Sequence, residues 1–243
     1  MKAIFPNWSA PSNVRAFTTT RQGGVSAVPY NSLNLGSHVG DSLPDVINNR
    51  SKLVTAMQIP EEPIWLNQTH STRVIDTICY QTTDADGSYS HQARAVSVVL
   101  TADCLPVLFC SKFGNEVAAA HAGWRGLCDG ILENTVSRFN CSRSQIIAWL
   151  GPAIGPSKFE VGEEVKAQFM AHDSEAEQAF KLIPTSQQKY LANLYLLATQ
   201  RLQKLGITLI YGGDFCTYSQ SDLFYSYRRE RETGRMASVI WFE

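Results

Sequence analysis

The chain has 243 residues, of which 44% are hydrophobic and 18% charged, so it can bury a sizeable core and is not expected to be disordered. Its formal net charge of −1 argues against nucleic acid or a membrane surface as a partner held by general attraction, although local arginines can still bind a small anion. We find no export signal and no run of about 18 apolar residues, so we expect a cytoplasmic protein with reduced cysteines and no membrane span.

The apolar patterns predict strands and helices that do not strictly alternate. In chain order we expect a strand at 14–19, a glycine-marked loop at 21–26, a helix at 42–58, strands at 64–66, 73–79 and 95–100, a hairpin of strands 106–110 and 116–120, a helix at 124–139, a strand at 146–150, a loop at 151–156, helices at 162–171 and 189–205, and strands at 207–211, 224–227 and 236–241. This order favours an α+β fold, with sandwiched mixed sheets flanked by helices, over a doubly wound fold. No linker or repeat interrupts it, so residues 1–243 are expected to form a single domain.

Two histidines and one cysteine stand in local sequences suited to a metal site, namely His70, Cys104 and His121. Two imidazoles, one thiolate and a fourth position left to water form the pattern of catalytic zinc. If the hairpin closes near Phe113, paired positions sum to roughly 226, which places Cys104 and His121 about one cross-strand spacing apart at its open end. His70 can join them only through tertiary folding.

Neighbouring charged residues are candidates for proton transfer and anion binding. Asp103 precedes Cys104 and can orient an imidazole or carry a proton. Arg125 opens a helix directly after His121, where free N–H groups and the helix dipole favour an anion. Arg50 and Arg228 are further candidates, because planar guanidinium suits phosphate or carboxylate.

Two other interpretations use the same residues. Cys104 can be a nucleophile with His121 as its base, which gives a metal-free cysteine hydrolase. Alternatively, Cys128 or Cys110 can supply a fourth ligand and make the zinc purely structural.

Seven short motifs together resemble the laccase-domain family, also called polyphenol-oxidase-like, purine nucleoside phosphorylase or peptidoglycan-editing-factor proteins. The resemblance runs from about Phe17 to Trp241. Its most specific parts are the motif that contains Cys104 and the motif that begins at His121. The motifs are Ser32-Leu-Asn-Leu-Gly36, Gln68-Thr-His70, Thr101-Ala-Asp-Cys-Leu-Pro-Val107, His121-Ala-Gly-Trp-Arg-Gly126, Gly151-Pro-Ala-Ile-Gly-Pro156, Phe159-Glu-Val-Gly162 and Tyr225-Ser-Tyr-Arg-Arg229.

The resemblance implies a mixed α/β fold and a zinc ion, or copper, on His70, Cys104 and His121. Asn34 and Gln68, which belong to the first two motifs, become candidate substrate contacts. The implied reactions are phosphorolysis of adenosine, inosine, guanosine and S-methyl-5′-thioadenosine, and deamination of adenosine, so the partners are a nucleoside and phosphate.

The resemblance also implies alternatives, namely copper-dependent oxidation of phenols and editing of peptidoglycan precursors. A multicopper oxidase needs a mononuclear centre and a trinuclear cluster, both rich in imidazole. The chain has only five histidines, of which His91 and His172 are expected to be solvated, so it cannot supply those ligands. A single copper ion in the site of two histidines and one cysteine remains open.

Overall fold

The structure, a computed structural model, describes residues 1–186 and 188–243. Its strands form a four-stranded sheet in the order β1-β2-β13-β5, a six-stranded sheet in the order β12-β8-β6-β7-β4-β3, and a three-stranded sheet in the order β10-β11-β9. The strands are β1 Ala3–Ile4, β2 Val14–Thr19, β3 Val74–Asp76, β4 Gly87–Ser90, β5 Ser97–Thr101, β6 Leu105–Ser111, β7 Val117–Ala122, β8 Ile146–Leu150, β9 Glu160–Gly162, β10 Phe180–Leu182, β11 Lys189–Ala192, β12 Leu209–Gly212 and β13 Met236–Phe242. The helices are α1 Leu43–Met57, α2 Trp124–Asp129, α3 Ile131–Val136, α4 Glu163–His172, α5 Leu194–Lys204 and α6 Tyr227–Glu230, with short 3-10 turns at Arg143–Gln145 and Ser174–Ala179.

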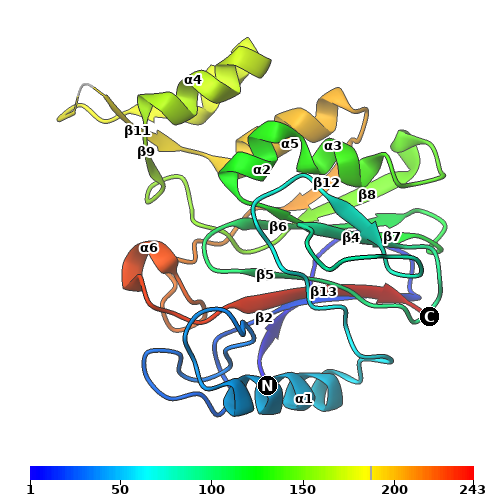
Figure 1. The fold of residues 1–243 in the computed structure, drawn as a ribbon. Coiled ribbons are helices and arrows are strands. Elements are labelled where there is room, and N and C mark those ends of the chain that lie inside the picture. The colour runs from blue at the N-terminus through cyan, green and yellow to red at the C-terminus, as the bar shows by residue number, and fades with distance from the viewer. Residues whose placement is uncertain (187) are drawn as a thin grey trace.

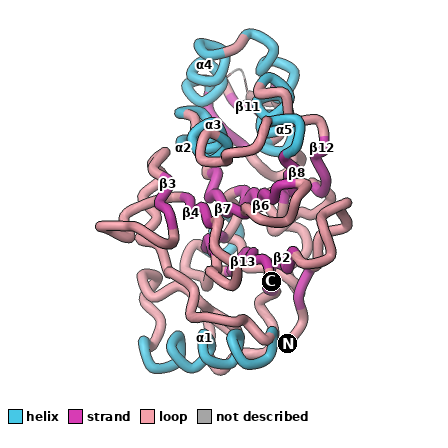
Figure 2. The backbone as a smooth tube through the Cα atoms, turned by 90° about the vertical axis from the view of Figure 1, so that its right-hand side faces the viewer, coloured by secondary structure: helices cyan, strands magenta, loops and turns pink. Residues whose placement is uncertain are grey.

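Two sheets and two helical layers stack in the molecule. Figure 1 shows α1 beneath the sheet that contains β2, β13 and β5, then the sheet that contains β6, β7 and β4, and finally α2, α3 and α5 on top. The same succession is visible in the orthogonal view of Figure 2. A separate apolar core fills each interface between layers, between α1 and the first sheet, between the two sheets, and between the second sheet and its helices. The α+β prediction with sandwiched, helix-flanked sheets is therefore confirmed.

The central hairpin of β6 and β7 closes almost as the sequence predicts. Leu105 faces Ala122 and Pro106 faces His121, a shift of one residue from the predicted sum. The run of alanines in β7 makes this hairpin possible, because small buried side chains let the strand pack on both faces. The hairpin therefore places the end of β7 beside the start of β6.

Several predicted elements differ from the structure. The expected helix at 124–139 is two helices, broken at Gly130, whose φ of 107° lies in the left-handed region. The expected helix at 189–205 begins with strand β11 and becomes helical only after Asn193, whose side chain caps α5.

Two predicted strands are absent from the described structure. Residues 64–66 join no sheet, and residues 224–226 form no strand but lead directly into α6, which begins at Tyr227. Strands β1, β4, β9 and β10 are short or polar and were not predicted, as the apolar pattern does not mark them. Within residues 1–186 and 188–243, no helix combines the length and apolar character that a bilayer crossing requires.

Candidate metal centre and active site

Three separate segments bring His70, Cys104 and His121 together. His121 is the penultimate residue of β7, Cys104 immediately precedes β6, and His70 lies in the loop before β3 with a φ of 62°. Their donor atoms all lie within 4.8 Å of one another, and His70 Nε2 is 3.7 Å from Cys104 Sγ. The two histidine rings meet edge to face, with centroids 4.9 Å apart. The geometry therefore assembles the three residues that the sequence selected.

The buried carboxylate of Asp86, at the start of β4, holds this cluster in place. Its Oδ1 accepts hydrogen bonds from His121 Nδ1 at 2.7 Å and from the backbone N–H of His70 at 3.0 Å. Its Oδ2 accepts from the backbone N–H and the hydroxyl of Ser71, each at 2.7 Å, and from the N–H of Thr69 at 3.2 Å. One carboxylate thus fixes both histidine-bearing segments and stabilises the unusual backbone at His70.

The hydrogen bond from His121 Nδ1 to Asp86 also determines which ring nitrogen of His121 can bind a metal. An ionised carboxylate only accepts hydrogen bonds, so Nδ1 of His121 carries a hydrogen, and Nε2 is the nitrogen that can bind a metal once it has lost its own proton. A carboxylate that orients a ligating imidazole in this way is a common feature of metal sites. The sequence analysis expected Asp103 to do this, and that expectation is wrong.

Mutual electrostatics activate the thiol of Cys104. Burial alone would raise its pKa, but the imidazoles of His121 and His70 outweigh that effect and lower the pKa to about 6. Burial opposes the charged form of His121 too, yet the Cys104 thiolate and Asp86 raise its pKa to about 9. Without a metal the pair is therefore a thiolate and an imidazolium at neutral pH. A divalent cation fits this electron-rich set, because it replaces the proton that His121 Nε2 would otherwise hold.

Gly123 leaves room for the cluster between β7 and α2. A Cβ added there would lie 2.6 Å from His70 Cδ2 and 3.2 Å from Cys104 Sγ. The backbone at Gly123 has φ −59° and ψ 153°, which any residue can adopt. The glycine is therefore needed for space beside the candidate ligands and not for its backbone conformation.

A cavity of about 500 Å³ opens above the cluster. Besides the cluster, arginines and aromatic groups line the cavity, namely His38, Trp124, Arg125, Tyr227 and Arg235. Arg125 stacks on the ring of Trp124 at 4.4 Å. Arg235 Nη1 donates to the carbonyls of Thr233 and Gly234. Among the described residues, neither arginine pairs with a carboxylate, so both can receive an anion.

Sequence analysis did not select Asp86, His38 or Arg235. Asp86 precedes the polar strand β4, which had not been recognised, and nothing in the local sequence sets this carboxylate apart. Arg235 immediately precedes β13, so its position at a strand end was the one available signal. His38 lies in a loop that only the tertiary fold carries to the cavity.

The remaining predicted site residues are divided between the cavity and the scaffold. Gln68 and Arg125 line the cavity, although both ends of the Gln68 amide are bonded to the backbone of Leu100. Asp103 is buried, and its carboxylate accepts from Thr217 Oγ1, Ser226 Oγ and the N–H of Arg228. It therefore ties the segment before β6 to the start of α6.

Asn34, Arg50 and Arg228 do not line this cavity. Asn34 is fully buried and bonds within its own loop and to the N–H of Arg235. Arg50 donates to the carbonyl of Leu35 and stacks on Trp65. Arg228 donates to the carbonyl of Glu160. In the structure these three residues hold the scaffold together.

The expected fourth thiolate is not part of the cluster. Cys128 packs in the core under the helices and Cys110 in the core between the sheets. Within the described residues, the donor group contains only His70, Cys104 and His121. The side that faces the cavity is left for solvent or substrate, as in a catalytic metal site.

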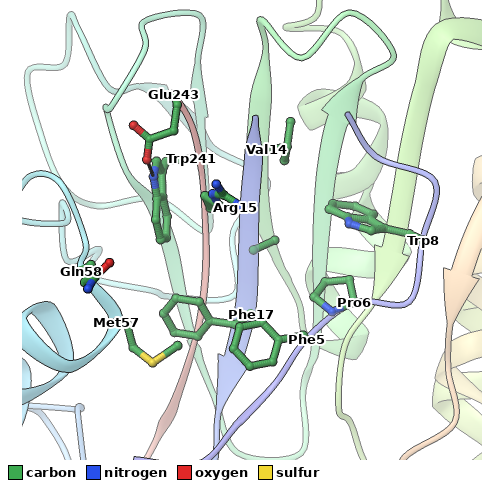
Figure 3. A pocket seen from close by; sticks show the side chains of 11 residues that line it. Phe5, Pro6, Trp8, Val14, Arg15, Phe17, Met57, Gln58, Trp241 and Glu243 are labelled. Carbon is green, nitrogen blue, oxygen red and sulfur yellow. Dashed lines mark hydrogen bonds between the residues drawn. The ribbon is translucent and has the colours of Figure 1, made fainter. Parts of the chain in front are cut away.

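Another hollow, of about 450 Å³, is lined by residues of β2, the segment before it, the end of α1 and the C-terminal residues. Figure 3 shows that aromatic side chains dominate it, with Phe5, Phe17 and Trp241 on its floor and wall. Its charged groups are Arg15 and Glu243, and it contains no nucleophile or metal-ligating cluster. The groups suited to metal or nucleophilic chemistry lie instead at the cavity beside His70.

Several known proteins are similar to this chain over nearly its whole length. Residues 15–243 match a family model described as multi-copper polyphenol oxidoreductase laccase. A protein of Haemophilus influenzae named purine nucleoside phosphorylase is 57% identical and is covered over 100% of both chains. The Escherichia coli protein named purine nucleoside phosphorylase YfiH is 53% identical over 99% of this chain and 98% of its own. A crystal structure of a Neisseria meningitidis protein superposes with a TM-score of 0.95 at 45% identity, covering 100% of both chains.

Proposed function

Because the chain belongs to the laccase-like family, whose model spans residues 15–243, and its relatives bear the name purine nucleoside phosphorylase, we propose that it phosphorolyses purine nucleosides. One observation carries the proposal. A cavity large enough for a nucleoside combines the His70, Cys104 and His121 cluster with two arginines that lack carboxylate partners. Adenosine, inosine, guanosine and S-methyl-5′-thioadenosine are the substrates we propose.

Phosphorolysis needs a held phosphate. A phosphate oxygen forms the bond to C1′ of the ribose, the bond from C1′ to the purine nitrogen breaks, and the purine leaves with a proton. Arg235 is suited to hold the phosphate, because only its Nη1 is engaged by the protein and its remaining N–H groups can form charge-assisted bonds. Arg125 at the cavity rim adds a second positive charge. Trp124 and Tyr227 offer aromatic faces to the purine or ribose.

We propose that a zinc ion is held by His70, Cys104 and His121, with copper as the alternative because it competes well for the same donors. Such an ion would supply Lewis acidity to a substrate in the cavity. Within the chain, Asp86 keeps Nε2 of His121 available, and the imidazoles keep Cys104 ionised. Adenosine deamination at the same site also needs a proton carrier. His38 is the remaining imidazole in the cavity, whereas Asp103 is engaged in the scaffold.

The test is to incubate metal-analysed protein with inosine and phosphate and to measure hypoxanthine and ribose-1-phosphate together. We expect equal amounts of both products, no base release without phosphate, and loss of activity in Cys104→Ser. Cys79→Ser is the matched control, because Cys79 is an exposed free cysteine outside the cavity. If neither inosine nor adenosine yields free base or a deaminated product, the proposed function is wrong.

The thiolate and imidazolium pair favours one other function, a metal-free cysteine hydrolase that edits peptidoglycan precursors. It predicts that a chelator leaves activity intact and that alkylation of Cys104 abolishes it. A metal-dependent phosphorylase loses activity under both treatments. Oxidation of phenols at a single copper ion would instead show activity that rises with copper loading and is absent from zinc-loaded protein.

A further inference from the structure

A second group of potential metal ligands lies outside the active site, where α2 ends against α4. Cys128 and Asp129 are the last two residues of α2, and His172 is the last residue of α4. One donor atom from each lies within 4.8 Å of the other two. Figure 1 shows α2 and α4 on the helix-covered side of the six-stranded sheet. The two donor-bearing ends come from segments far apart in the sequence.

The three side chains are otherwise unpartnered. In the described part of the chain, none of them takes part in a side-chain hydrogen bond or an ion pair, although neighbouring polar groups do. Cys128 is buried, while Asp129 and His172 are exposed. A buried thiol below two solvent-facing donors gives a cation an open approach.

Charges of both signs surround Cys128. Asp129 and Glu133 contribute negative charge near the thiol, and Arg201 contributes the positive charge. Arg201 is already paired with Glu133, through Nε and Oε1 at 2.7 Å. The other oxygen of Glu133, Oε2, is buried and has no hydrogen-bond partner. A thiolate, a carboxylate and a neutral imidazole are ligands that zinc accepts together.

We propose that Cys128, Asp129 and His172 form a second site for a divalent transition metal of the zinc class, which links the end of α4 to the end of α2. On binding, the Cys128 thiol releases its proton to solvent and the thiolate bonds to the metal, so no oxidant or reductant is needed. Burial raises the pKa of Cys128, which makes binding weaker at low pH. The first turn of α2 carries Trp124 and Arg125 of the cavity, so this site stiffens the helix that forms one wall of the active site.

Cobalt(II) distinguishes this site from the active site, because cobalt bound to a thiolate gives a charge-transfer band in the near ultraviolet. In Cys104→Ser, which removes the active-site thiolate, we expect the band to remain on titration with cobalt. The apparent affinity for cobalt should fall at least about tenfold when His172→Ala or Asp129→Asn is added, since each substitution removes one of three protein ligands. His91→Ala added to the same background is the matched control, because His91 is an exposed histidine at another place. No band in Cys104→Ser, or a band unchanged by His172→Ala, overturns the proposal.

Elemental analysis of wild-type protein gives an independent check that does not depend on the Cys104→Ser variant. After metal removal and dialysis against zinc, we expect about two equivalents per chain in wild type and in His91→Ala, and about one in His172→Ala. His172 is exposed, so its removal should leave the far-ultraviolet circular dichroism unchanged. A zinc content that is the same in wild type and His172→Ala contradicts the second site and leaves the proposed nucleoside activity untouched.

Discussion

Replacing Asp86 by asparagine tests the most consequential contact of the candidate site. The side chain keeps its shape but loses its charge and one acceptor oxygen. If the new amide group takes the place of Oδ2, the N–H groups of Thr69 and Ser71 lose their acceptor. If it takes the place of Oδ1, it donates to Nδ1 of His121, and the hydrogen of that ring moves to Nε2, where it blocks metal binding.

The magnitude follows from these contacts. Two part-buried donors that lose a charged acceptor cost about 1–3 kcal/mol each, so we expect Asp86→Asn to lower the free energy of unfolding by about 2–6 kcal/mol. Loss of a carboxylate that orients a ligating histidine typically lowers metal affinity about 10- to 100-fold, which corresponds to about 1.4–2.8 kcal/mol. Metal affinity should therefore fall even at temperatures where the variant remains folded.

The assay is competition with a chelator of known affinity for zinc, read beside a urea unfolding curve. Asp84→Asn is the matched control, because Asp84 is two residues away and exposed, and it accepts one hydrogen bond, from Asn67 at 2.8 Å. We expect Asp84→Asn to bind zinc as wild type does. Wild-type zinc affinity in folded Asp86→Asn would refute the assignment of Asp86 as the residue that orients His121.

Three further predictions follow from the same geometry. Gly123→Ala should displace the His70 ring and weaken metal binding at least about tenfold. It should change the free energy of unfolding by no more than about 1 kcal/mol, because the backbone there suits alanine. Zinc competition and urea unfolding measure the two effects, and unchanged zinc affinity would count against the packing argument. In metal-free protein, the rate of Cys104 alkylation, followed by mass spectrometry, should reach half its maximum near pH 6 and fall at lower pH, because the thiolate is then protonated. A midpoint near pH 9 would mean that the imidazoles do not stabilise the thiolate. Arg235→Leu should raise the KM for phosphate about 10- to 100-fold, the equivalent of one lost charge-assisted bond. Arg15→Leu, which lies in β2 and lines the other hollow, should leave that KM unchanged, and equal KM values in both variants would remove Arg235 from the phosphate site.

Local patterns in the sequence predict the central scaffold well. The continuous apolar runs that become β5, β6, β7 and β8 are buried in full, and the hairpin count comes within one residue of the observed pairing of Pro106 with His121. These strands are predictable because fully buried strands appear in the sequence as continuous apolar runs. Elements decided by tertiary contacts were missed. Strand β4 reads Gly-Ser-Tyr-Ser and exists because β3 and β7 pair with its two edges.

The candidate site shows the same division. His70, Cys104 and His121 are recognisable because two imidazoles and a thiolate in such local sequences suit a metal. Their support is not recognisable from the sequence. Asp86 contacts a loop about 16 residues earlier and a strand 35 residues later, and neither separation gives a periodic signal. Asp103, which stands next to Cys104 in sequence, has a φ of 84° that turns its carboxylate toward Thr217 and Ser226 instead.

X-ray absorption spectroscopy of the zinc-loaded protein tests the central claim most directly, because it counts the atoms around the metal. We expect two nitrogen atoms at about 2.0–2.1 Å and one sulfur atom at about 2.3 Å, with a light atom from solvent as the fourth ligand. In Cys104→Ser the sulfur signal of this site should disappear, with His172→Ala included in both samples so that only one site is occupied. A spectrum without sulfur before that change, or with a second sulfur that persists after it, would contradict a catalytic metal held by His70, Cys104 and His121.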